Sequence, residues 1–129
     1  MKSEHQLNWT ADLVVVGMTE PAAAAATDAA RQGKHVLIVG ESQNACYRRG
    51  LRRMLDAAGA GCRERVSILA GFEVVSVDGI GAVEVVLIRK LRTGHLIGIN
   101  TGAMLATTAL APGVVSAAFQ NPSDGTPPG

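Results

Sequence analysis

Hydrophobic residues in the first third of the chain gather in two short runs on either side of an alanine-rich segment. The first run, residues 13–16, ends at Gly17, and the second covers residues 36–39. Short unbroken apolar runs are typical of strands that are buried on both faces of a parallel sheet. The five consecutive alanines at residues 22–26 favour a helix between the runs. Residues 11–42 therefore predict a β-α-β unit.

The signals that start and stop this helix are present. Pro21 suits a first helical position, where its missing N–H costs no hydrogen bond. Thr19 or Glu20 can cap the helix or favour its positive end. Gly33 is a typical C-terminal cap. The pattern predicts a helix that begins near Glu20 and ends at Gly33.

The hydrophobic period changes in the second half of the chain. Residues 45–58 carry apolar side chains at three- and four-residue spacing, which predicts a second helix. Short apolar runs then follow, and the turn sequences at residues 78–81 and 92–94 predict a three-stranded antiparallel meander. The expected strands are residues 66–69, 72–77, 83–89, 96–99 and 103–106. Strands and helices that alternate in this way predict an α/β fold.

The two ends of the chain flank a single predicted domain, residues 11–112. Residues 1–10 are polar and are expected to form a flexible N-terminal arm. Residues 113–129 are rich in Pro, Gly and Ser towards their end and are expected to be a mostly disordered tail. Hydrophobic residues make up 47% of the chain but aromatic residues only 3%. The core is therefore built from Ala, Val, Leu and Ile, which suits helices packed closely on a parallel sheet.

Charge and hydropathy exclude several partners. The net charge of +1 provides no general attraction to nucleic acid or to a membrane surface. The longest apolar stretch, residues 103–118, is interrupted by Thr, Pro, Gly and Ser and falls short of the ~20 apolar residues that span a membrane. The first residues contain no segment of the signal-peptide type. We expect a soluble, cytoplasmic protein without a membrane span.

The order of the predicted elements over residues 11–112 is similar to that of the nucleotide-binding domain of the thioredoxin reductase and pyridine nucleotide-disulfide oxidoreductase flavoproteins. The stretch VVVG followed by AAAAATDAARQGKHVLIV resembles the first β-α-β unit of that superfamily, VDGIGAVEVVLIRKLRTGHL resembles its meander, and LATTALAPG resembles the strand end near its cofactor. The resemblance implies a three-layer Rossmann-like FAD/NAD(P)-binding fold, with flanking helices on a parallel sheet and a three-stranded antiparallel meander. It also implies NAD(P) or FAD as candidate cofactors.

The glycine fingerprint of that superfamily is degenerate in this chain. Its G-x-G-x-x-G pattern reads Gly17, Met18, Thr19, Glu20, Pro21 and Ala22. Gly17 and Ala22 fit the pattern. The β-branched Thr19 replaces the glycine that lets the backbone approach a pyrophosphate. Glu20 brings a negative charge to the helix end that would hold a phosphate. The resemblance implies cofactor contacts along this stretch, and the degenerate positions weigh against them.

The acidic residue that binds the ribose in that superfamily is displaced. Gly40 stands at its position, and Glu41 and Ser42 follow. These three residues are the remaining candidate cofactor-binding residues. Arg48 and Arg49 are candidates for contacts with a phosphate or a partner, or they form a solvated helix face.

Cys46 is a candidate reactive thiol. It lies near the start of the predicted second helix and close to two arginines, and both features lower the pKa of a thiol. The alternative is a half-buried small residue. The spacing from Cys46 to Cys62 fits neither a CxxC redox pair nor a zinc site. The three histidines are scattered, so no metal site and no catalytic residue are expected.

Two functions stay open. The first is a small stand-alone dinucleotide-binding-type module or subunit of a flavin- or NAD(P)-dependent oxidoreductase system, not catalytic alone because a flavin half and a CxxC motif are absent. The second is a non-catalytic structural, assembly or regulatory subunit that keeps the Rossmann fold but has lost nucleotide binding. A fragment of a longer gene product is a further reading. We expect a homo-oligomer or a larger oxidoreductase complex, since a half-flavoprotein domain exposes apolar surface.

Overall fold

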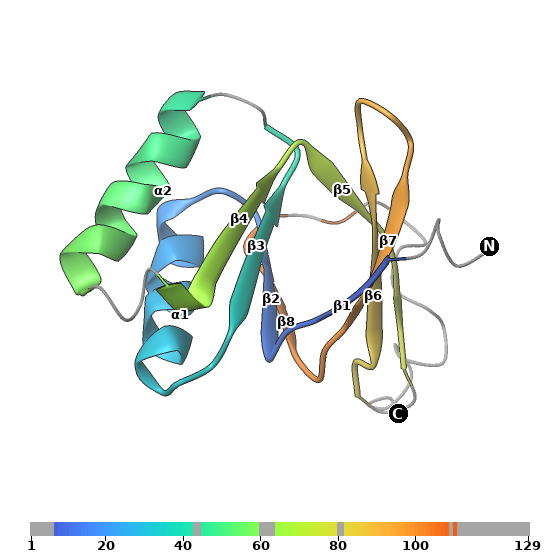
Figure 1. The fold of residues 1–129 in the computed structure, drawn as a ribbon, viewed down its shortest axis with the longest axis horizontal. Helices are drawn as coiled ribbons and strands as arrows, with labels where there is room; N and C mark the ends of the chain where they lie inside the picture. The colour runs from blue at the N-terminus through green and yellow to red at the C-terminus, as the bar shows by residue number, and fades with distance from the viewer. Residues whose placement is uncertain (1–6, 43–44, 60–63, 80–81, 109, 111–129) are drawn as a thin grey trace, which may run out of the picture.

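The structure is a computed structural model that describes residues 7–42, 45–59, 64–79, 82–108 and 110. Its elements form three layers: two helices, a parallel sheet and a second, mostly antiparallel sheet (Figure 1). The parallel sheet is the middle layer, with the helices over one face and the second sheet over the other. This architecture is the α/β fold that the sequence predicts.

The parallel sheet contains the strands that the apolar runs predict. Its order is β4-β3-β2-β8, and all neighbouring strands pair in parallel. The strands are β2 (Leu13–Val16), β3 (Val36–Gly40), β4 (Val66–Ala70) and β8 (Met104–Ala106). Val14 and Val16 pack towards the second sheet, and Val15 packs towards the helices. Both faces of β2 are therefore buried, which explains why its sequence is apolar without alternation.

The second sheet contains the predicted antiparallel meander. Its strands are β5 (Phe72–Asp78), β6 (Val85–Lys90) and β7 (Leu96–Asn100). They pair in the order β7-β6-β5. The expected strand over residues 83–89 starts two residues later than predicted, because the Glu84 N–H donates to the Asp78 carbonyl oxygen at 2.9 Å and closes the turn before β6.

A fourth strand in this sheet corrects one expectation. Residues 7–10, expected in a flexible arm, form β1 (Leu7–Thr10) and pair in parallel with β7. Trp9 gives the physical reason, because its ring packs on the core between the two sheets. Residues 1–6 and the expected tail over residues 113–129 lie outside the described residues.

The helices cover the other face of the parallel sheet. They are α1 (Glu20–Arg31) and α2 (Ala45–Ala58), close to the predicted bounds. The inner face of α1 consists of alanines, and the buried ones are Ala22, Ala23, Ala26, Ala29 and Ala30. These small side chains let α1 lie close to the sheet, and Leu51 and Leu55 of α2 complete this half of the core. Among the described helices, neither is long and apolar enough to cross a membrane.

Candidate functional site

The strand β2 ends in a tight turn at Gly17, where the resemblance places a cofactor. Gly17 has φ +117°, a conformation that side chains with a Cβ rarely adopt. Its N–H donates to the Val39 carbonyl oxygen at 2.8 Å. A Cβ at this position would collide with Thr107 Oγ1 and lie 3.0 Å from Thr108 Cγ2. The backbone conformation and the contact with Thr107 therefore require glycine at position 17, independently of any cofactor.

A chain of hydroxyl groups connects this turn to the end of β8. Thr19 Oγ1 donates to Thr107 Oγ1 at 3.0 Å, and Thr107 Oγ1 donates to the Val16 carbonyl oxygen at 2.8 Å. Thr19 Oγ1 also accepts the Ala22 N–H at 3.2 Å, which makes Thr19 the N-cap of α1. We call this arrangement the hydroxyl chain Thr19–Thr107–Val16. It satisfies polar groups at three element ends with the protein's own side chains.

The N-terminus of α1 consequently has few donors left for an anion. Pro21 has no N–H, and the Ala22 N–H is bonded to the cap. The exposed side chain of Glu20 adds a negative charge in the first turn. A phosphate at this helix end would meet the Glu20 carboxylate, and neither Pro21 nor Ala22 would offer it a free N–H. The structure thus supports the predicted conflict between this turn and a pyrophosphate.

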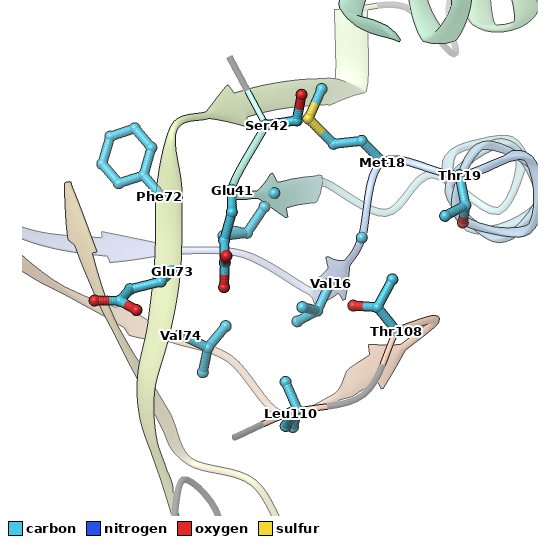
Figure 2. A pocket seen from close by; sticks show the side chains of 13 residues that line it. Val16, Met18, Thr19, Glu41, Ser42, Phe72, Glu73, Val74, Thr108 and Leu110 are labelled. Atoms are coloured by element: carbon cyan, nitrogen blue, oxygen red, sulfur yellow. The ribbon is translucent and has the colours of Figure 1, made fainter. Parts of the chain in front are cut away.

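The side chain of Met18 explains why β3 ends in Gly40 and not in an acidic residue. Gly40 is buried, and a Cβ there would collide with Met18 Cγ and lie 2.8 Å from Met18 Sδ. The Met18 side chain therefore occupies the space that an acid at position 40 would need. Figure 2 shows Met18 reaching from the Gly17 turn to Ser42. The first acidic residue after the end of β3 is Glu41.

These elements enclose a cleft of about 440 Å³ at the carboxyl ends of β2 and β3. Its volume lies in the range of small-molecule sites, ~300–1,000 Å³, and its place at the carboxyl edge is where open α/β sheets bind ligands. The Glu41 carboxylate points into the cleft (Figure 2). The lining residues are Val16, Gly17, Met18, Thr19, Val39, Gly40, Glu41, Ser42, Phe72, Glu73, Val74, Thr108 and Leu110.

The electrostatics of the cleft are acidic. Glu41 and Glu73 are its charged lining residues, and no Lys or Arg appears among the described residues that line it. Glu73 Oε2 accepts a hydrogen bond from Arg89 Nε at 2.7 Å and forms an ion pair with the same guanidinium group. The carboxylate of Glu41 is therefore the charge that faces a ligand. Within the described ranges, no group of three or more His, Cys, Asp or Glu residues could hold a metal ion.

Most of the predicted cofactor-binding residues come together at this cleft. Those that line it are Gly17, Met18, Thr19, Gly40, Glu41 and Ser42. The other three do not reach it, because Ala22 is buried on the inner face of α1 and Glu20 and Pro21 face solvent. Glu20 lies instead at the groove between α1 and α2. Whether the lining residues bind a cofactor stays a prediction.

Sequence reasoning misses the wall that β5 and the residues after β8 contribute. Phe72, Glu73 and Val74 reach the cleft because the Gly71 N–H donates to the Gly40 carbonyl oxygen at 2.8 Å. This bond brings the start of β5 to the end of β3, and no local motif encodes it. Thr107 is also missed, although the stretch LATTALAPG marks this strand end as close to the site.

The candidates on α2 lie apart from the cleft. Arg48 and Arg49 are exposed, and neither lines the cleft. Arg48 faces a separate hollow beside the β4–β5 turn. Cys46 is the second residue of α2, but its side chain lies outside the described residues, so the reactive-thiol hypothesis stays a prediction.

Comparison with solved structures identifies the fold. Neither a protein-family model nor a curated protein sequence matches this chain. The thioredoxin reductase from Streptococcus pyogenes is similar with a TM-score of 0.59 and 19% identity, over 78% of this chain and 32% of the reductase. The Giardia duodenalis thioredoxin reductase is similar with a TM-score of 0.56 and 20% identity, over 84% and 33%.

A halogenase shares the same architecture. The myxobacterial chondrochloren halogenase, described as a variant of FAD-dependent halogenases, has a TM-score of 0.59 and 13% identity, over 78% of this chain and 38% of the halogenase. The chain thus spans about a third of the length of these proteins. These likenesses, together with the sheet order, show that this chain has the Rossmann-like fold of FAD/NAD(P)-binding oxidoreductases, as its sequence resemblance predicts.

Proposed function

We propose that this chain is a small dinucleotide-binding-type module that serves, alone or as a subunit, a flavin- or NAD(P)-dependent oxidoreductase system. The observation that carries the proposal is the cleft of about 440 Å³ at the carboxyl edge of the parallel sheet, with the Glu41 carboxylate directed into it. A carboxylate in this place accepts hydrogen bonds from ribose hydroxyls. The fold of oxidoreductases that bind FAD or NAD(P) supports this assignment.

The residues of the cleft fit the two halves of a dinucleotide unequally. The adenosine half fits, because Glu41 offers acceptors for a ribose and Val16, Val74 and Leu110 offer apolar walls. The pyrophosphate fits poorly, since the hydroxyl chain Thr19–Thr107–Val16 already uses the Ala22 N–H. We therefore expect the adenosine half to supply most of the affinity.

The role of the chain in such a system is to hold a nucleotide for a partner. A bound nicotinamide or flavin supplies the hydride chemistry, and the protein supplies binding and orientation. Glu41 would fix the ribose, and the apolar walls would exclude water from one face of the adenine. The partner that uses the bound nucleotide is a second copy of the chain or a larger oxidoreductase complex.

Ligand-dependent stabilisation tests the proposal directly. Thermal unfolding of the chain is measured with adenosine, NAD⁺, NADH, NADPH and FAD. A ligand at a hundredfold excess over its dissociation constant stabilises the folded state by about 2.7 kcal/mol. We expect a saturable rise in melting temperature with at least one dinucleotide and with adenosine. If none of the five ligands changes the melting temperature, the proposal is wrong.

The substitution Glu41→Gln tests the ribose contact. It keeps the size of the side chain but removes the charge that strengthens hydrogen bonds from the ribose, so we expect the dissociation constant of the best ligand to rise about tenfold. Glu84→Gln is the matched control, because Glu84 is exposed and is not among the residues that line the cleft. Equal affinities in the two variants would contradict the role of Glu41.

A second candidate function is a non-catalytic structural, assembly or regulatory subunit that has lost nucleotide binding. The observation that favours it is the turn after β2, where Thr19 caps α1 and Glu20 adds negative charge. This reading agrees with a module that meets only protein partners through its helices or sheet edges.

The variant Thr19→Gly with Glu20→Asn separates the two functions. Removing the capping hydroxyl frees the Ala22 N–H, and removing the carboxylate restores the positive end of the helix dipole. We expect NAD⁺ affinity to increase about tenfold while adenosine affinity stays unchanged. Calorimetric titration of the variant and of Glu20→Asn alone provides the measurement and its control. An unchanged NAD⁺ affinity in a folded variant would show that Thr19 and Glu20 are not what weakens binding of the pyrophosphate.

A further inference from the structure

Three cations from two separate elements line a small hollow beside the cleft. The hollow measures about 240 Å³, and its lining residues are Arg48, Ala70, Gly71, Lys90 and Arg92. Arg48 comes from α2, and Lys90 and Arg92 come from the end of β6 and the turn after it. Figure 1 shows the start of α2, the β4–β5 connection and the β6–β7 turn at the same end of the molecule. The side chains of this hollow therefore converge although they are far apart in sequence.

Backbone hydrogen bonds fix the two sides of this hollow. The Leu91 N–H donates to the Gly71 carbonyl oxygen at 2.9 Å. Leu91 stands between Lys90 and Arg92, so this bond holds both cations beside the β4–β5 turn. The turn between β6 and β7 is also closed, because the Lys90 N–H donates to the His95 carbonyl oxygen at 2.9 Å. The cations are thus carried by ordered backbone.

Among the residues that the structure describes, no acid neutralises the positive charges in this hollow. No Asp or Glu lines it, and within the described part of the chain none of the three cations has an ion-pair partner. Glu73, an acid on the adjoining strand β5, is already paired with Arg89. The first turn of α2 contains no acidic residue, so the positive end of its dipole adds to the charge of Arg48. Three like charges around one concavity favour an anion.

We propose that the hollow formed by Arg48, Lys90 and Arg92 is a binding site for a phosphate group. Guanidinium groups contact phosphate oxygens in a bidentate manner, and an ammonium group adds a compact charge, so the three side chains suit a dianion with several oxygens. This site goes beyond the proposed function, because it shares no lining residue with the cleft that contains Glu41 and needs no ribose. The phosphate is either inorganic or carried by a nucleotide.

The test is calorimetric titration of the full chain with inorganic phosphate, ADP and adenosine, at an ionic strength held constant with sodium chloride. We expect saturable binding of phosphate or ADP that weakens about tenfold in the variant Lys90→Ala with Arg92→Ala. The matched control is Arg31→Ala with Lys34→Ala, which removes the same charge from exposed positions outside the hollow. Circular dichroism verifies that both variants are folded.

The outcomes identify the source of the phosphate. Binding of inorganic phosphate supports a free-anion site, and binding of ADP without inorganic phosphate, lost in Lys90→Ala with Arg92→Ala, supports a phosphate carried by a nucleotide. Absence of binding by both, or equal weakening in the two double variants, overturns the site. Glu41→Gln is expected to retain phosphate binding. A chain that binds phosphate but neither adenosine nor any of the four dinucleotides would refute the proposed function and leave this site intact.

Discussion

The substitution Gly17→Ala is expected to destabilise the folded chain by about 3 kcal/mol, from the strain of a positive φ and from overpacking. Gly17 has φ +117°, and a Cβ there would collide with Thr107 Oγ1. The collision falls on a hydroxyl that is held at both ends by hydrogen bonds, so it cannot move without breaking them. A loss of this size is a large part of the ~5–15 kcal/mol stability of a typical domain.

Two other glycines separate the contributions to this loss. Gly33 has φ +86°, and no atom lies within 4 Å of the place that a Cβ would take, so Gly33→Ala reports backbone strain alone, about 1 kcal/mol. Gly50 has the same open space within α2, so Gly50→Ala is expected to stabilise the helix by about 1 kcal/mol. Urea titrations measure all three values. An equal cost for Gly17→Ala and Gly33→Ala would show that the collision with Thr107 contributes nothing.

Thr107→Val is expected to cost about 2 kcal/mol of folding stability, because it leaves a partly buried hydroxyl without its acceptor. The valine keeps the shape of the threonine but neither accepts from Thr19 nor donates to the Val16 carbonyl oxygen. The end of β8 would then be connected to the turn after β2 by the backbone bond from the Thr107 N–H to Val16 alone, at 2.8 Å. Equilibrium unfolding in urea measures the difference.

The neighbouring threonine provides the control for this prediction. Thr108 is exposed, so Thr108→Val is expected to change stability by less than about 0.5 kcal/mol.

A double-mutant cycle with Thr19→Val and Thr107→Val tests the hydroxyl chain itself, and we expect a coupling energy of about 1 kcal/mol between Thr19 and Thr107. Strictly additive losses would show that the two hydroxyls act independently.

The fold was predictable where a local pattern encodes an element. The apolar runs predict the parallel strands, and the capping residues and spacing predict both helices. The strand β1 was not predicted. Its sequence LNWT alternates apolar and polar residues but is only four residues long, and its partner β7 lies far along the chain at Leu96–Asn100. Parallel pairing between distant segments leaves no short-range signal.

The candidate site shows the same division. Gly17 and Glu41 could be found because each lies at the end of an apolar run. The role of Thr19 could be anticipated only in part, because its partner Thr107 is 88 residues away. The replacement of an acid by Gly40 becomes intelligible only when Met18 is seen to fill the adjoining space. Contacts between element ends decide these details, and a single sequence does not display them.

The position of Trp9 gives the chain a built-in optical reporter. Trp9 is the only tryptophan in the sequence, and it lines a hollow of about 400 Å³ together with Leu37 and Leu69 of the parallel sheet. Its indole therefore bridges the strand β1 and the middle layer. Fluorescence emission from this ring follows the separation of the two sheets, whereas circular dichroism follows the helices. Divergence of the two signals during unfolding would reveal that the sheets part before the helices melt.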